Sequence, residues 1–122
     1  MSSGSGGPPA RDALRAGVPG KLVRDRIPEI IRNRGAEPET YIASAAEYSW
    51  RLRQKLDEEV AEVMDADGAA EVGEELADVL EVVYALAKEL GISADQLEAV
   101  RARKAEQRGG FADRVVWLGN LT

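Results

Sequence analysis

Two segments with helical periodicity dominate the middle of the chain and constrain its fold more than any other feature. The first spans residues 44–64 and the second spans residues 69–90, with the sequence DADG at 65–68 between them. In both segments, apolar residues recur at intervals of three and four, which is typical of helices that bury one face. We therefore expect two long amphipathic helices joined by a short break.

Capping signals extend this pattern to a body of about four helices. Ser44 with Glu47, and later Ser93 with Gln96, have the spacing of a capping box, which begins a helix. A short helix is expected near Pro28, because proline suits the first turn. The segments 39–43 (ETYIA) and 113–118 (DRVVWL) alternate like strands. The predicted fold is an all-α helical bundle, with possible short terminal β-strands.

The length and the first residues suggest how the domain is organised. With 122 residues the chain is expected to form one domain, of a size at which helical proteins often complete their core with a second subunit. Residues 1–20 are rich in Gly, Ser and Pro and predict a flexible tail, so the domain is expected to cover residues 21–122. We expect a homodimer or homotetramer.

Composition excludes several kinds of chemistry. The chain has no cysteine and no histidine, which removes thiolate nucleophiles, imidazole catalysis and Cys/His zinc sites. No apolar run is long enough to span a bilayer, and no secretory signal is evident, so a soluble cytoplasmic protein is expected. The net charge of −6 argues against a nucleic-acid duplex as the main partner, because such binding depends on Lys and Arg.

The acidic residues are concentrated in the two amphipathic segments. Eleven of the 22 lie between Asp57 and Glu81, a stretch without lysine or arginine. On a helical projection of about 100° per residue, Glu59 and Glu62 border the apolar stripe of the first helix. Glu75 and Asp78 flank the stripe of the second. The alternative is an ordinary solvated face, which is the usual place for a glutamate.

Packing of the two helices through these stripes would bring the four carboxylates together. Their mutual repulsion is not offset by any basic residue of the stretch, which suggests that a cation is bound. Oxygen ligands without His or Cys favour Mg²⁺ or Mn²⁺, and Mg²⁺ is commonly shared with substrate phosphates. We therefore predict that Glu59, Glu62, Glu75 and Asp78 bind a divalent metal.

Two basic clusters are candidates for binding phosphate groups. Lys104 and Arg108 project to the apolar side of the last predicted helix. Lys21, Arg24 and Arg26 precede the short helix. The alternative for each is a surface charge, with Lys104 and Arg108 extending from a helix end towards water.

Four sequence motifs support a resemblance that covers residues 21–118. EEVAE (58–62) followed by EELAD (74–78) resembles the signature of the all-α nucleoside triphosphate pyrophosphohydrolases, the MazG-like and phosphoribosyl-ATP pyrophosphohydrolase-like superfamily. KLVRDRIPEII and RKAEQRGGF resemble the two ends of a branch of house-cleaning pyrophosphatases. The resemblance implies a Mg²⁺-dependent enzyme that cleaves a nucleoside triphosphate between the α and β phosphates, giving a nucleoside monophosphate and pyrophosphate.

The resemblance also implies roles for individual residues. Metal ligation corresponds to Glu59, Glu62, Glu75 and Asp78, and the basic pair near the phosphates corresponds to Lys104 and Arg108. Without histidine, Glu59 or Glu62 is expected to act as the general base for a water that attacks the α phosphorus. Phosphoribosyl-ATP hydrolysis in histidine synthesis, and a non-enzymatic helical interaction module, remain alternatives.

Overall fold

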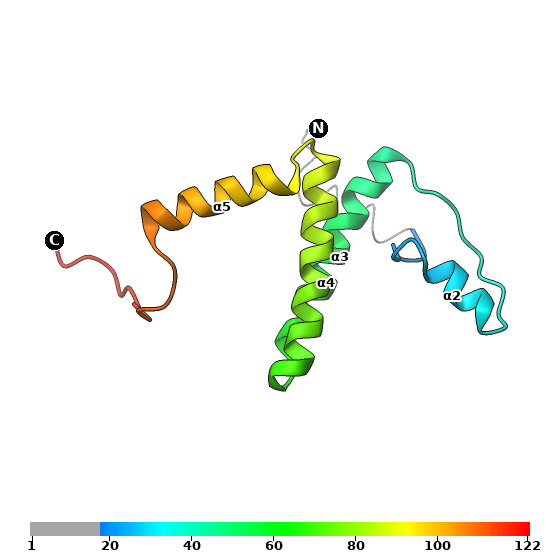
Figure 1. The fold of residues 1–122 in the computed structure, drawn as a ribbon, viewed down its shortest axis with the longest axis horizontal. Helices are drawn as coiled ribbons and strands as arrows, with labels where there is room; N and C mark the ends of the chain where they lie inside the picture. Colours follow the sequence, from blue (N-terminus) through cyan, green and yellow to red (C-terminus); the bar gives the residue numbers. More distant parts are fainter. Residues whose placement is uncertain (1–17) are drawn as a thin grey trace. The chain divides into compact units, whose positions relative to one another are not determined.

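The computed structural model describes residues 18–122, and these residues form four helices without a strand (Figure 1). The predicted tail lies outside the described residues except for residues 18–20. The all-α bundle is therefore confirmed. The helices are α2 (Ile27–Asn33), α3 (Ala45–Asp65), α4 (Gly68–Glu89) and α5 (Ala94–Arg108).

Helices α3 and α4 form a helical hairpin and run side by side in Figure 1. Helix α3 begins where the Ser44 hydroxyl accepts a hydrogen bond from the Glu47 amide, as the capping signal predicts. Only Ala66 and Asp67 connect the two helices, which makes them antiparallel neighbours. Gly68 has a φ of +82°, a left-handed conformation that glycine adopts without a steric penalty, and it lets the chain reverse here.

The shorter helices also begin as predicted. Pro28 lies in the first turn of α2. Ser93 and Gln96 form the complete capping box of α5, with both side chains bonded to the opposite backbone amide. The chain divides into two compact units, one ending at Leu86 within α4 and one covering Ala87–Thr122. The first unit contains α2, α3 and most of α4.

The core of the first unit is thin. Trp50 and Leu52 of α3 and Val82 of α4 are buried, but no described large side chain is completely buried. Much of the apolar surface of the hairpin stays exposed, at Val60, Met64, Leu76, Leu80 and Tyr84. The apolar stripes read from the sequence are thus only partly covered within one chain.

The two predicted strands are absent, which corrects that part of the sequence analysis. Residues 39–43 and residues 113–118 do not form the hydrogen-bonded ladder of a β-sheet. An isolated two-stranded ribbon is marginal in water, so alternation of apolar residues alone does not make a strand. Among residues 18–122, no helix has the length and apolarity needed to cross a membrane.

Candidate metal centre

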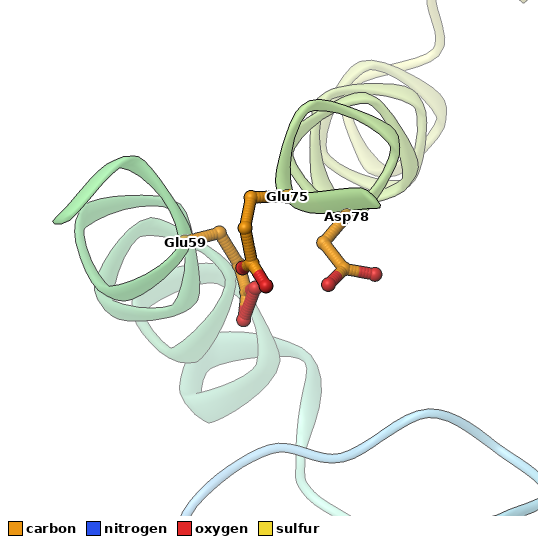
Figure 2. A group of neighbouring side chains, drawn as sticks. All are labelled: Glu59, Glu75 and Asp78. Carbon is orange, nitrogen blue, oxygen red and sulfur yellow. The ribbon is translucent and has the colours of Figure 1, made fainter. Parts of the chain in front are cut away.

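Three carboxylates meet between the two helices of the hairpin. Glu59 projects from α3, and Glu75 and Asp78 project from α4, where their spacing of three residues places them on one face. Each offers an oxygen within 4.8 Å of the others, and all three side chains are half-buried. Figure 2 shows Glu59 and Glu75 pointing towards each other, with Asp78 beside them.

The electrostatics of this carboxylate cluster (Glu59, Glu75 and Asp78) disfavour ionisation of Glu75. Burial raises the pKa of Glu75, and the negative charges of Asp78, Glu62 and Glu59 raise it further. Like charges at this separation oppose ionisation, and a cation placed among them would reverse that effect. Glu75 is therefore the residue at which the repulsion within the cluster is most evident.

Basic residues from outside the acidic stretch partly neutralise the cluster, which the sequence analysis did not anticipate. Lys55 lies one turn before Glu59, with Nζ 3.7 Å from its carboxylate and 2.9 Å from that of Glu58. Arg24 precedes Asp78 by 54 residues in the sequence and donates a hydrogen bond of 2.5 Å to its carboxylate. The cluster thus has two protein cations beside it, one at each end.

The remaining predicted site residues are not members of this three-carboxylate group. Glu62 is exposed on α3 and is not part of the three-carboxylate group, although its charge acts on Glu75. Lys21 is exposed in the segment before α2. Lys104 and Arg108 belong to the second unit and are exposed on α5. Val100, on the apolar side of α5, is exposed as well.

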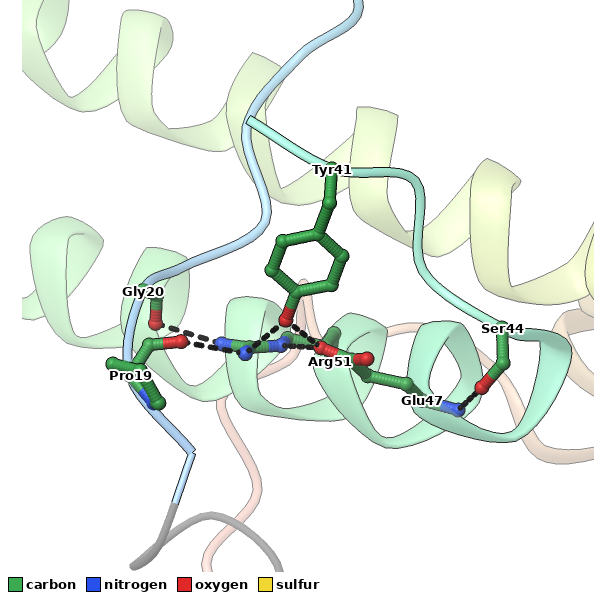
Figure 3. A network of polar contacts seen from close by, with 6 residues as sticks. All are labelled: Pro19, Gly20, Tyr41, Ser44, Glu47 and Arg51. Atoms are coloured by element: carbon green, nitrogen blue, oxygen red, sulfur yellow. Dashed lines mark hydrogen bonds and ion pairs between the residues drawn. The ribbon is translucent and has the colours of Figure 1, made fainter. Parts of the chain in front are cut away.

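A buried polar network in the first unit was also missed. Arg51 of α3 is 3% exposed and is bonded to Glu47 one turn earlier and to the distant carbonyls of Pro19 and Gly20 (Figure 3). The spacing of four between Glu47 and Arg51 is visible in the sequence and predicts their ion pair. The contacts to residues 19 and 20 have no local signal.

The chemistry of the donor set fits a hard divalent cation. Three carboxylates on two packed helices supply only oxygen, which suits Mg²⁺ or Mn²⁺ better than zinc or copper. The crowding of these carboxylates and the raised pKa of Glu75 both favour binding of a cation, because a cation offsets the repulsion between them.

Comparison with known proteins places the chain in a family. Residues 25–105 match the phosphoribosyl-ATP pyrophosphohydrolase family, and this range includes α2, α3, α4 and most of α5. The chain is also 55% identical over 47 residues to an uncharacterized protein of Mycolicibacterium smegmatis (strain ATCC 700084 / mc(2)155). That alignment covers 38% of this chain and 48% of the relative, so the chain spans about half the length of the curated relative it matches.

No solved structure matches the chain. The family assignment accords with the all-α fold and with the sequence motifs that carry the carboxylates. The chain belongs to the phosphoribosyl-ATP pyrophosphohydrolase family, a member of the MazG-like all-α nucleoside triphosphate pyrophosphohydrolase superfamily.

Proposed function

We propose that the protein is a Mg²⁺-dependent nucleoside triphosphate pyrophosphohydrolase. It cleaves between the α and β phosphates, releases a nucleoside monophosphate and pyrophosphate, and serves to remove unwanted nucleotides from the cellular pool. The observation that carries the proposal is the convergence of Glu59, Glu75 and Asp78 within 4.8 Å, from two helices of a chain in this family.

In this proposal the carboxylate cluster holds the metal. A divalent cation there would polarise the phosphoryl oxygens and lower the pKa of the attacking water. The cation would be held in place by three carboxylates at fixed positions on α3 and α4, those of Glu59, Glu75 and Asp78. Glu62 lies three residues from Glu59 on α3, exposed to solvent, and is available either as a fourth ligand or as the base that accepts the proton of the water. Glu59 is the other candidate for that base.

Basic residues bind the phosphates in the same proposal. Arg24 already lies at the cluster through Asp78, and Lys21 precedes it in the same segment. Lys104 and Arg108, both exposed on α5, correspond by the sequence resemblance to the basic pair near the phosphates. The proposal assigns them the charge that develops on the leaving pyrophosphate, a role that makes Lys104 a catalytic residue. The triphosphate carries enough charge to contact several cations together with the metal.

The test is a panel of canonical, oxidised and uracil-containing triphosphates assayed with and without Mg²⁺. Release of pyrophosphate together with the monophosphate supports the proposal, whereas diphosphate and inorganic phosphate would assign a different bond. Hydrolysis in ¹⁸O-labelled water adds a second criterion, since attack at the α phosphorus puts the label into the monophosphate. Absence of hydrolysis across the panel would favour a non-enzymatic helical interaction module.

A second candidate function is hydrolysis of phosphoribosyl-ATP in histidine synthesis. It is favoured by the description of the matched family. Both kinds of substrate present a triphosphate to the same carboxylates, and phosphoribosyl-ATP differs from ATP by the phosphoribosyl group on its adenine. Including phosphoribosyl-ATP in the panel separates the two, because the preferred substrate has the higher kcat/KM.

The proposal includes a homodimer or homotetramer acting in the cytoplasm, where nucleotide pools are found. The exposed apolar residues of α3 and α4 support a partner of the same kind, since a helical hairpin with a thin core gains stability by covering them.

A further inference from the structure

Arg51 joins helix α3 to the segment that enters the domain. Its guanidinium donates 2.7 Å and 2.8 Å hydrogen bonds to the carbonyl oxygens of Gly20 and Pro19 (Figure 3). Two further bonds go to the Glu47 carboxylate at 3.0 Å and the Tyr41 hydroxyl at 3.2 Å. The Tyr41 hydroxyl also donates to Glu47. The network therefore ties three separate stretches of the first unit to one side chain.

The buried guanidinium of Arg51 has a hydrogen-bond acceptor for each of its three nitrogens. Arg51 is 3% exposed, and removing a guanidinium from water is unfavourable unless its donors are all well paired. The planar fork of arginine can serve a carboxylate and two carbonyls at once, which a lysine ammonium cannot do with the same geometry. Two of its acceptors lie 31 and 32 residues earlier in the chain, so they fix the path of that segment.

The anchored segment leads directly to the carboxylate cluster. Gly20 has a φ of +87°, which turns the chain, and Arg24 follows four residues later. Four residues extend at most about 14 Å, so the anchor confines the backbone of Arg24 to that distance. The Arg24 side chain then donates its 2.5 Å bond to Asp78. A short piece of backbone thus connects the residues bonded to Arg51 with the residue bonded to the cluster.

The ion pair between Arg24 and Asp78 is too exposed to hold this segment by itself. The Arg24 side chain is 55% exposed, and exposed pairs contribute little because water screens them and both side chains lose freedom. A pre-positioned backbone reduces that loss of freedom. The bonds from Arg51 instead fix the backbone at Pro19 and Gly20, five and four residues before Arg24.

We propose that Arg51 is a positioning residue that acts through Arg24. By holding the carbonyls of Pro19 and Gly20, it keeps Arg24 beside Asp78, where the guanidinium neutralises the cluster of the free protein. When a divalent cation binds Asp78, Arg24 loses its bond to that carboxylate but stays beside the cluster, where it binds a phosphate of the substrate. This inference rests on the proposed function for the substrate, but the positioning itself does not depend on catalysis.

The central experiment is a double-mutant cycle between Arg51→Gln and Arg24→Gln in the full chain. If Arg51 acts through Arg24, Arg51→Gln lowers kcat/KM by about ten- to a hundredfold alone but by less than about twofold in the Arg24→Gln background. Equal losses in both backgrounds, or no loss from Arg51→Gln, would overturn the proposal. Arg53→Gln is the matched control, because within residues 18–122 the side chain of Arg53 bonds to Ser49, one turn earlier on the same helix.

A second readout uses Mg²⁺ alone, titrated by calorimetry without nucleotide. Arg24→Gln removes the cation that competes for Asp78, so we expect Mg²⁺ affinity to rise about two- to tenfold. Arg51→Gln should raise the affinity in the same direction and add nothing further to Arg24→Gln. Arg26→Gln removes the same charge from the same segment, but Arg26 pairs with Glu29, so it should have a smaller effect.

A third readout requires neither metal nor turnover. Trypsin cleaves after an arginine whose side chain has entered the specificity pocket of the protease. The rate of cleavage after Arg24 therefore reports how often the Arg24 side chain leaves Asp78. Arg51→Gln should accelerate this cleavage at least about fivefold, whereas Arg53→Gln should not. An unchanged rate would overturn the proposal even for a protein without enzymatic activity. If the wild type hydrolyses no triphosphate but Arg51→Gln still accelerates trypsin cleavage, the proposed function is rejected and the positioning role of Arg51 is retained.

Folding of the variants is checked by thermal melts. If Arg51→Gln unfolds, Arg51→Lys replaces it, because lysine keeps the charge next to Glu47 but cannot bond both carbonyls in the forked geometry. The same non-additivity with Arg24→Gln is then expected. If Arg51→Lys also fails to fold, Arg51 is required for the stability of the hairpin, and the proposal is overturned.

Discussion

At the scale of single residues, Glu75 concentrates the unfavourable electrostatics of the carboxylate cluster. We predict that Glu75→Gln leaves the metal-free protein at least as stable as the wild type, because it removes one of several repelling charges while keeping the shape. Turnover should be lost, since a neutral amide is a poor ligand for Mg²⁺. Thermal melts and the pyrophosphate assay measure both effects, and undiminished turnover would remove Glu75 from the site.

The raised pKa of Glu75 gives a pH dependence with a definite sign. A carboxyl whose folded pKa lies above its unfolded value of 4.5 destabilises the folded state when ionised, and this penalty disappears as pH falls through the folded pKa. The stability advantage of Glu75→Gln should therefore be present at pH 7 and vanish below about pH 4.5. Denaturant melts across this range test the trend, and an advantage that grows on acidification would contradict it.

Also at the residue scale, replacement of Lys104 distinguishes an enzyme from a non-enzymatic helical interaction module. Lys104 is exposed on α5, so Lys104→Met should change the free energy of unfolding by less than about 0.5 kcal/mol. If Lys104 contacts the triphosphate, kcat/KM should fall by about one to several orders of magnitude while the affinity for Mg²⁺ alone stays nearly unchanged. Retained activity in the folded variant would transfer the phosphate role to Arg108 or Arg24.

At the scale of elements, the reversal between α3 and α4 is what sets Glu59 against Glu75. We predict that Gly68→Ala lowers the free energy of unfolding by about 1 to 2 kcal/mol, because a side chain is strained at a φ of +82°. A Cβ there would meet no atom within 4 Å, so strain alone accounts for the loss.

Gly73→Ala is the matched control for this turn. Gly73 lies inside α4, also with open space around a Cβ and without a positive φ, so alanine should stabilise the helix by up to about 1 kcal/mol. Urea unfolding of both variants gives the comparison. Equal effects at the two glycines would show that the turn carries no special strain.

At the scale of the whole molecule, the exposed apolar residues of the hairpin predict self-association. Light scattering at micromolar concentration should give the mass of a dimer or tetramer, because Leu76, Leu80 and Tyr84 are each about half exposed in one chain. Leu80→Asp should shift the protein towards the monomer, since a charge in a covered apolar surface is unfavourable. A wild-type monomer would contradict the prediction.

The sequence by itself determined the helical elements and the direction of the key acids. Periodicity and capping boxes are local, and they placed α3 and α5 to within a residue or two of their observed starts. Projection around each helix identified Glu59, Glu75 and Asp78 as bordering the apolar stripes, and these three converge. The same local reasoning failed for the two expected strands, because a strand needs a partner that the alternation does not specify.

Only the tertiary structure decided which charges meet. Glu62 borders the stripe as Glu59 does but stays exposed, because a projection gives a direction around one helix axis and not the position of the neighbouring helix. The pairing of Arg24 with Asp78 spans 54 residues, and the bonds from Arg51 to the carbonyls of Pro19 and Gly20 span 32 and 31. Contacts between such distant residues depend on the path of the folded backbone, which no local spacing encodes.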